Sequence, residues 1–119
     1  MRDYALIWKY VSEARAGGRT GKSLARLKVF KSPNILPSAL IKMILDDAKP
    51  ADVIAAAADP DTRHQRENEC IAYFFMGQLS LINGDTKAAA EYFQKTLATG
   101  VTNFRQYTAA RVELERIQK

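Results

Sequence analysis

The stretch that decides the fold is residues 70–100, CIAYFFMGQLSLINGDTKAAAEYFQKTLATG. Its first half places apolar side chains at nearly the i, i+3, i+4 and i+7 spacing of one buried helical stripe: Ile71, Phe74, Phe75, Leu79 and Ile82. Next, Gly84 is suited to end a helix and Asp85 to cap the following one. The stretch therefore predicts two antiparallel helices joined by a tight turn, with the second ending at Gly100.

A glycine stands inside the first of these two helices. Gly77 costs about 1 kcal/mol relative to alanine in a helix interior, so a structural reason for it is expected. Such a glycine is tolerated where a partner helix needs close backbone approach. The alanines at 88–90 on the second helix supply that partner and let Phe93 and Leu97 close over the hairpin.

The same stretch resembles the tetratricopeptide repeat (TPR) family. Five residues match its bulky, small, glycine, alanine and aromatic positions: Tyr73, Gly77, Gly84, Ala89 and Phe93. Three residues depart from the pattern, where the family has an aromatic residue, a small apolar residue and a closing proline: Ser80, Thr96 and Val101. The resemblance implies an all-α fold, a right-handed TPR-like stack of helical hairpins with about seven helices.

The rest of the chain is expected to complete one domain over residues 1–119. Its parts are a degenerate helical hairpin (1–32), two short helices (35–58), the best-matching hairpin (63–100) and a C-terminal capping helix (103–119). We expect the second helix to extend from Thr20 to Lys31 and Asn103 to cap the last one. On the third helix, the residues expected to face inward are Ala39, Leu40, Met43 and Ile44.

A further resemblance is to bacterial TPR proteins with a Cys-x-Ala-x-Phe-Tyr-x-Gly-like helix and a closing Phe-x-x-Tyr helix. The matching residues are Cys70, Ala72, Phe74, Phe75 (where the pattern has Tyr) and Gly77, then Phe104 and Tyr107. Outer-membrane TPR lipoproteins that act as adaptors for periplasmic enzymes show a similar pattern. The resemblance implies a non-catalytic protein–protein interaction scaffold that binds a peptide or helix in a groove.

In TPR proteins the groove is lined by the first helices of the repeats. The corresponding positions here are Ile71, Phe74, Gln78 and Leu81. The alternative is that the third and fourth helices cover the three apolar members of this set as part of the core. If they are exposed, the face is apolar enough to favour a hydrophobic partner or a homodimer.

The charge is uneven along the chain. Residues 1–50 contain ten Lys and Arg against four Asp and Glu, and the segment from Arg15 to Lys31 has no acidic residue. A basic surface made of Arg15, Arg19, Lys22 and Arg26 is therefore the alternative site, for nucleic acid or another anionic partner. A solvated helix face is the simpler interpretation. The aromatic residues follow core periodicity and do not interleave with the basic run, which argues against nucleic acid.

Residues 16–23, AGGRTGKS, match a relaxed phosphate-binding loop that has alanine in place of its first glycine. Residues 43–46, MILD, also mimic the apolar run and aspartate that hold magnesium. Such a loop needs a buried strand before it and a helix after it. Residues 10–15 are instead the polar end of an amphipathic helix. We expect a glycine-rich turn between helices, and nucleotide binding is the less favoured alternative.

We expect no catalytic residue, no metal site and no cofactor. His64, the only histidine, lies about 240° around a helix from Cys70 and shares a face only with Glu67, too few ligands for zinc. Cys70 is expected to be buried. No apolar run approaches the roughly 18 residues of a membrane span, and Asp3 argues against a signal peptide. The sequence leaves the location open: it fits the cytoplasm as it stands, and the periplasm if a leader was removed.

Overall fold

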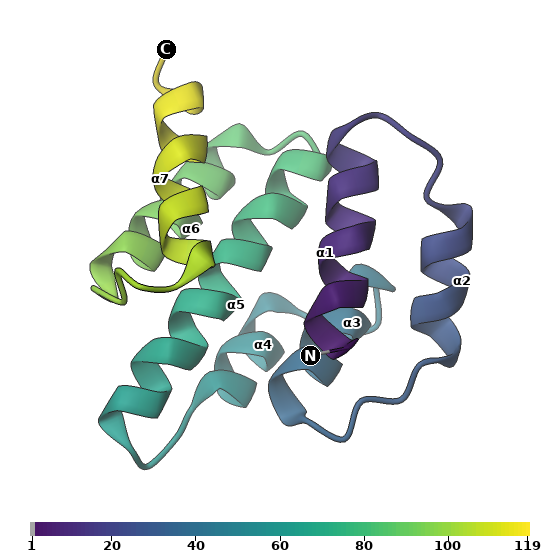
Figure 1. Cartoon of the computed structure of the whole chain (residues 1–119), viewed down its shortest axis with the longest axis horizontal. Helices are drawn as coiled ribbons and strands as arrows, with labels where there is room; N and C mark the ends of the chain where they lie inside the picture. Colours follow the sequence, from purple (N-terminus) through teal and green to yellow (C-terminus); the bar gives the residue numbers. More distant parts are fainter. Residues whose placement is uncertain (1) are drawn as a thin grey trace. The chain divides into compact units, whose positions relative to one another are not determined.

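The computed structural model describes residues 2–119 and has seven helices over that range (Figure 1). They are α1 (Arg2–Arg15), α2 (Gly21–Val29), α3 (Ile35–Ile44), α4 (Pro50–Ala57), α5 (Thr62–Ile82), α6 (Thr86–Ala98) and α7 (Arg105–Ile117). The described residues contain no strand, so the predicted all-α class is confirmed. The chain divides into two compact units, unit 1 up to Ala56 and unit 2 from Ala57 to Lys119.

Two helix ends differ from the expected ones, those of α2 and α7, and both differences have clear causes. α2 ends at Val29 because Phe30 has extended backbone, with φ −75° and ψ 127°. α4 begins at Pro50, whose fixed φ suits the first position of a helix. Asn103 is not the cap of α7, because Phe104 occupies the N-cap position with φ −87° and ψ 142°.

In unit 1, α1 packs against both α2 and α3. The core of the unit is formed by fully or almost fully buried aliphatic side chains from these helices: Ile7, Val11, Leu27 and Leu40. A polar contact also joins the first two helices, since the Ser23 hydroxyl on α2 donates to Glu13 Oε1 on α1. The expected pairing of the first two helices is therefore present, although α2 is shorter than predicted.

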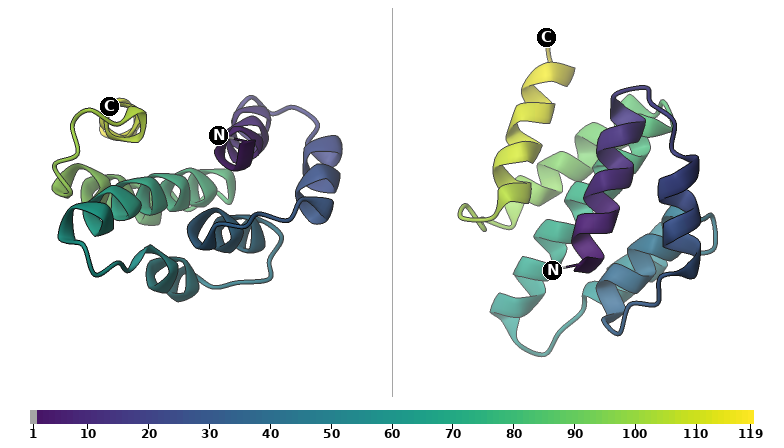
Figure 2. Two further views of the ribbon diagram at one scale, coloured as in Figure 1. Left: turned by 60° about the horizontal axis from the view of Figure 1, so that its bottom comes forward. Right: turned by 45° about the vertical axis from the view of Figure 1, so that its right-hand side comes forward.

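In unit 2, α5 packs along α6 and also contacts α7, as Figure 2 shows for the first pair. The segment of α5 from Phe74 to Leu79 is buried at every position, so burial extends beyond the single predicted stripe. Phe93 of α6 is fully buried with its ring centroid 6.0 Å from that of Phe74. A helix buried on most sides is typical of the centre of a domain, and α5 has that place in unit 2.

The turn between α5 and α6 has the predicted local structure. Gly84 has φ +81°, in the left-handed region that favours glycine. The Asp85 side chain caps α6 by accepting from Ala88 N at 3.0 Å. At the other end of α6, Gly100 has φ +72°. Both glycine stop signals and the aspartate cap predicted from the sequence are confirmed.

Candidate functional site

The structure does not present the expected groove residues as one exposed surface: Ile71, Phe74, Gln78 and Leu81. Phe74 is fully buried, and its ring centroid lies 5.2 Å from that of Phe75 and 6.0 Å from that of Phe93. A partner could reach this ring only by displacing core side chains. The expectation that Phe74 lines a groove is corrected by its place in the core of unit 2.

Gln78 is also buried, by a contact that the sequence spacing did not suggest. Its Nε2 donates to Glu113 Oε2 on α7 at 2.6 Å, and both side chains are less than a tenth exposed. Arg116 NH1 lies 3.7 Å from Glu113 Oε1, one turn along α7. The side of α5 that carries Gln78 is thus occupied by α7. Ile71 and Leu81 remain partly exposed, but without the two central side chains they do not make a groove.

Unit 1 contains a pocket of about 660 Å³ between α3 and α4. Its α3 wall follows the i, i+3, i+4, i+7 spacing of one helix face: Ile35, Ser38, Ala39 and Lys42. Its α4 wall follows the same spacing: Asp52, Ala55 and Ala56. The segments before and after α3 complete the lining: Ser32, Pro33, Asn34, Asp47 and Ala48. We call this site the α3–α4 pocket.

The α3–α4 pocket has one charged end. Lys42 lies in the last turn of α3, Asp47 in the segment that connects α3 to α4, and Asp52 in the first turn of α4. Asp52 Oδ2 accepts from Lys49 N at 2.8 Å, so one carboxylate also caps α4. Two carboxylates and one ammonium group make this end suited to polar, preferentially cationic, groups.

Small side chains line both helical walls in the rest of the pocket. Ala39, Ala55 and Ala56 leave room for another chain to approach the two helices closely. Ile35, at the opposite end of α3 from the charges, is 75% exposed and adds an aliphatic side chain to the lining. An apolar surface beside a few polar groups is typical of sites that bind peptides or small molecules.

A hydrogen-bond network fixes the segment that forms one end of the pocket. The Ser32 hydroxyl donates to Asp3 Oδ2 on α1, and Asn34 Nδ2 donates to the same oxygen at 3.2 Å. Asn34 N also donates to Ser32 Oγ at 3.1 Å. The Ser32 hydrogen bond is the main reason that the pKa of Asp3 lies below its usual value. The network ties the pocket to α1, at the core of unit 1.

Sequence reasoning missed this pocket because its signal is weak. Ala39 was expected to face the core, yet it is half-buried and lines the pocket. The useful signal was a pair of helices whose small residues recur at helical spacing, with Ile35 starting the stripe on α3. Alanines at that spacing are equally typical of close packing between helices, so the sequence alone did not separate the two cases.

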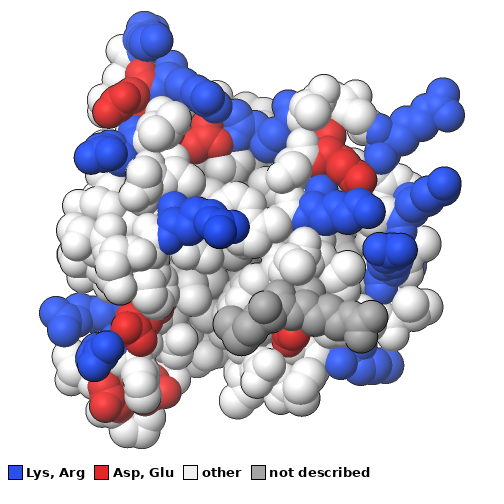
Figure 3. Space-filling view, viewed as in Figure 1, with Lys and Arg blue, Asp and Glu red and all other residues white. Residues whose placement is uncertain are grey.

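The expected basic surface is accessible. Arg15, Arg19, Lys22 and Arg26 are all exposed, the last two on α2 and the first at the end of α1. Figure 3 shows Lys and Arg side chains gathered at the edge of the face where α2 lies in Figure 1. The structure therefore provides a second surface in unit 1, separate in its residues from the α3–α4 pocket.

Residues 16–20 form the turn between α1 and α2, and residues 21–23 begin α2, so the segment is a glycine-rich turn between helices, as expected, and not a strand-to-helix loop. Gly17 takes φ +73° to reverse the chain after α1. Ser23, which would be the hydroxyl ligand of a phosphate-binding loop, is buried and donates to Glu13. A carboxylate at that position repels phosphate, so the geometry does not favour nucleotide binding here.

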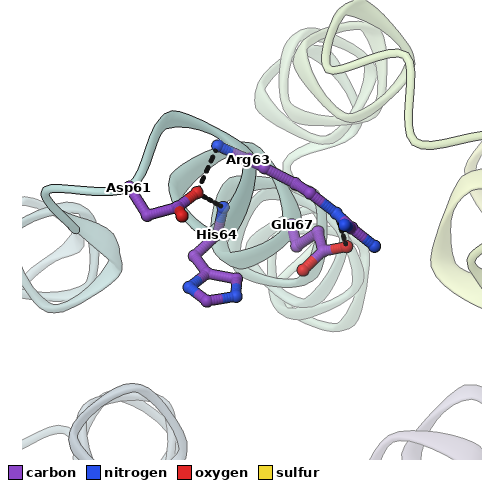
Figure 4. A network of polar contacts seen from close by, with 4 residues as sticks. All are labelled: Asp61, Arg63, His64 and Glu67. Atoms are coloured by element: carbon purple, nitrogen blue, oxygen red, sulfur yellow. Dashed lines mark hydrogen bonds and ion pairs between the residues drawn. The ribbon is translucent and has the colours of Figure 1, made fainter.

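His64 belongs to the start of α5 and makes no polar pair there with Glu67. Asp61 Oδ1 accepts from Arg63 N at 2.9 Å and His64 N at 3.1 Å, and the second bond is the main cause of the lowered pKa of Asp61. Figure 4 shows the Glu67 carboxylate next to Arg63, with Nε 3.5 Å from Oε2. Residues 2–119 hold no group of three His, Cys, Asp or Glu placed for a metal ion.

Two accessible surfaces of unit 1 thus remain, the α3–α4 pocket and the basic face of α2, and both are suited to binding. Within the described part of the chain, no helix has both the length and the apolar character needed to cross a membrane. Comparison of the chain with protein-family models, curated proteins and solved structures found no match.

Proposed function

We propose that the chain is a non-catalytic protein-interaction scaffold that binds a peptide segment in the α3–α4 pocket. The observation that carries this proposal is the pocket wall, where the exposed Ile35 and three alanines from two helices form one apolar lining. Small side chains let a partner's backbone lie close to both helices, as in helix-in-groove recognition. The volume, about 660 Å³, lies within the range of about 300–1,000 Å³ found for binding pockets.

The occupant follows from the distribution of charge along the pocket. An apolar side chain of the peptide would pack against Ile35 and Ala39, and a cationic side chain would lie near Asp47 and Asp52 at the charged end. Lys42 restricts this end to one cation, because it already offsets part of the negative charge. The preferred peptide therefore has a bulky aliphatic residue and one Lys or Arg about two helical turns apart, since α3 spans 10 residues.

In this proposal, unit 2 is a TPR-like hairpin closed by a capping helix. The burial of Gly77 and Ala89 and the place of Gly84 in the turn support this part of the proposal. Thr96, which departs from the pattern, is accommodated in the core because its hydroxyl donates to Tyr92 O at 3.0 Å. Glu113 of α7 covers the face of α5 that would otherwise be the groove, which moves partner binding to unit 1.

A peptide-display selection against the folded chain tests the proposal. Peptides that are enriched should be synthesised with a fluorescent label and titrated with the protein by anisotropy. We expect Ala39→Arg and Ala55→Arg to fill the pocket and weaken binding at least about tenfold, which corresponds to about 1.4 kcal/mol. The matched control is Ala98→Arg, at an exposed position of α6, which should leave binding unchanged at the same helicity.

The charged end gives an independent readout. Asp47→Lys should weaken binding of peptides with a cationic residue and leave peptides without one nearly unaffected, because Asp47 is exposed and lies at that end only. Enriched peptides that bind equally well to Ala39→Arg, Ala55→Arg and the parent chain would exclude the pocket as the site. A selection that enriches no peptide would overturn the proposed function.

A further inference from the structure

The formal net charge of +5 belongs entirely to unit 1. Residues 1–56 contain ten Lys and Arg against five Asp and Glu, whereas residues 57–119 contain eight of each. Two of the five acids are already engaged in the structure, since Asp3 accepts from Ser32 and Glu13 accepts from Ser23. The other three, Asp46, Asp47 and Asp52, lie around the connection between α3 and α4. No acidic residue in the segment from Arg15 to Lys31 therefore offsets the positive charge of α2.

α2 displays that charge on one side and buries the other. Ser23 and Leu27 are buried against the rest of unit 1. The outward side chains Lys22, Arg26, Lys28 and Val29 are all exposed, and we call these four the α2 ridge. Lys22, Arg26 and Val29 recur at i, i+4 and i+7, so they lie in one row along the helix. Arg19 and Lys31, both exposed, extend the positive charge at the two ends.

One apolar side chain, Val29, lies among these cations in the last turn of α2. Val29 is 77% exposed, the largest exposed fraction among the large hydrophobic residues described. α2 contains no aromatic residue on which a base could stack and no acidic residue of its own. A row of cations that ends in an exposed aliphatic side chain complements a protein segment with carboxylates and one apolar residue better than it complements a phosphate backbone.

We propose that the α2 ridge binds an acidic amphipathic segment of a partner protein. The segment would place carboxylates opposite Lys22 and Arg26 and an aliphatic side chain against Val29. α2 has 9 residues and is about 13 Å long, so it matches about two and a half turns of a partner helix. The site does not use the α3–α4 pocket and does not depend on the function proposed for it.

The test uses the full chain and two labelled probes of equal formal charge. One is a synthetic helical peptide of about 15 residues with glutamates at i, i+4 spacing and one leucine on the same face. The other is a mixed-sequence single-stranded oligonucleotide. Anisotropy titrations at low and at physiological salt should give tighter binding of the peptide at physiological salt, because its apolar contact with Val29 is not screened.

Matched variants separate a specific site from general attraction. We expect the triple variant Lys22→Gln, Arg26→Gln, Lys28→Gln to weaken peptide binding about tenfold, from the loss of the charge pairs at Lys22 and Arg26 and of the nearby positive charge of Lys28. The control Arg105→Gln, Arg111→Gln, Lys119→Gln removes the same charge from exposed positions of unit 2 and should change binding less than about twofold. Equal losses in the two triple variants would overturn the proposal in favour of non-specific attraction.

Val29→Ser distinguishes the two classes of partner. It keeps every charge, so it should weaken peptide binding and leave oligonucleotide binding unchanged. An oligonucleotide that binds more tightly than the peptide at physiological salt, together with no effect of Val29→Ser on the peptide, would overturn the proposal and identify the ridge as a nucleic-acid surface.

Discussion

The ring of Phe93 lies against the backbone of Gly77. A Cβ atom at position 77 would be 2.5 Å from Phe93 Cε1, 2.8 Å from Cδ1 and 2.9 Å from Cζ. Carbon atoms that are not bonded to each other cannot approach so closely, and the ring itself is fully buried and cannot turn away into solvent. The helix-weakening glycine predicted to allow close approach is thus explained by one aromatic ring of α6.

Gly77→Ala should destabilise the chain by about 1–3 kcal/mol, although alanine is the better helix former by about 1 kcal/mol. The added methyl group forces Phe93 or the backbone of α6 to move. Urea unfolding followed by circular dichroism measures the change. The double variant Gly77→Ala, Phe93→Leu should lose less stability than the sum of the losses of the two single variants, because the smaller side chain at 93 leaves space for the added methyl group. Strictly additive effects of the two substitutions would contradict the contact.

Gln78→Glu tests the buried pair between α5 and α7. The substitution places a second carboxylate where Gln78 Nε2 now donates to Glu113 Oε2 at 2.6 Å. We expect a loss of about 2–4 kcal/mol in the free energy of unfolding at neutral pH, since a buried donor is replaced by a like charge. The swap Gln78→Glu, Glu113→Gln restores one amide and one carboxylate and should recover most of the stability. No recovery in the swap would show that the pair does not hold α7.

Asp3 should make the stability of unit 1 dependent on acidity. The Ser32 hydroxyl holds the pKa of Asp3 below its usual 3.8, so folding favours the ionised carboxyl. The resulting stabilisation is fully present above about pH 4 and is lost as the pH falls through the folded-state pKa. The difference in unfolding free energy between the parent chain and Asp3→Asn should therefore be larger at pH 7 than at pH 2.5. Ser32→Ala should show the same trend, and a difference independent of pH would rule out this role.

Cys70 reports on the opening of α5. Its thiol is fully buried, and burial raises the pKa above the usual 9.0. A disulfide reagent should modify it slowly in the folded chain and rapidly in urea, because the reactive thiolate is both scarce and inaccessible in the native state. Gly77→Ala should speed the reaction. Rapid modification of the native parent chain would contradict the packing of unit 2.

The structural features that depend on residues close together in the sequence could be predicted. The turn at Gly84, the cap at Asp85 and the close approach at Gly77 each depend on residues of one hairpin, and the structure has all three. The expected groove did not follow, because Gln78 is paired with a residue 35 positions away on α7. Spacing within one helix identifies a face but not the element that covers it. The cap of α7 was missed by one residue, as helix ends often are.

The candidate site was less predictable than the fold. The α3–α4 pocket depends on how far apart two short helices lie, and no residue pattern within either helix records that distance. The network of Asp3, Ser32 and Asn34, which fixes one end of the pocket, joins positions about 30 residues apart. The basic surface was identified from the sequence because charged residues can be counted without knowing the fold. Lys22 and Arg26 are exposed, as that surface requires.

The glycines of unit 2 have a consequence for how the chain can diverge. At Gly84 there is empty space around a Cβ but φ is +81°, whereas at Gly77 a Cβ would collide with a named ring. Position 84 should thus vary alone, among residues that tolerate the left-handed region, such as asparagine. Positions 77 and 93 should covary: a larger residue at 77 requires a smaller one at 93. Glycine is thus favoured at position 84 by a backbone torsion angle, and at position 77 by the space that a side chain distant in the sequence occupies.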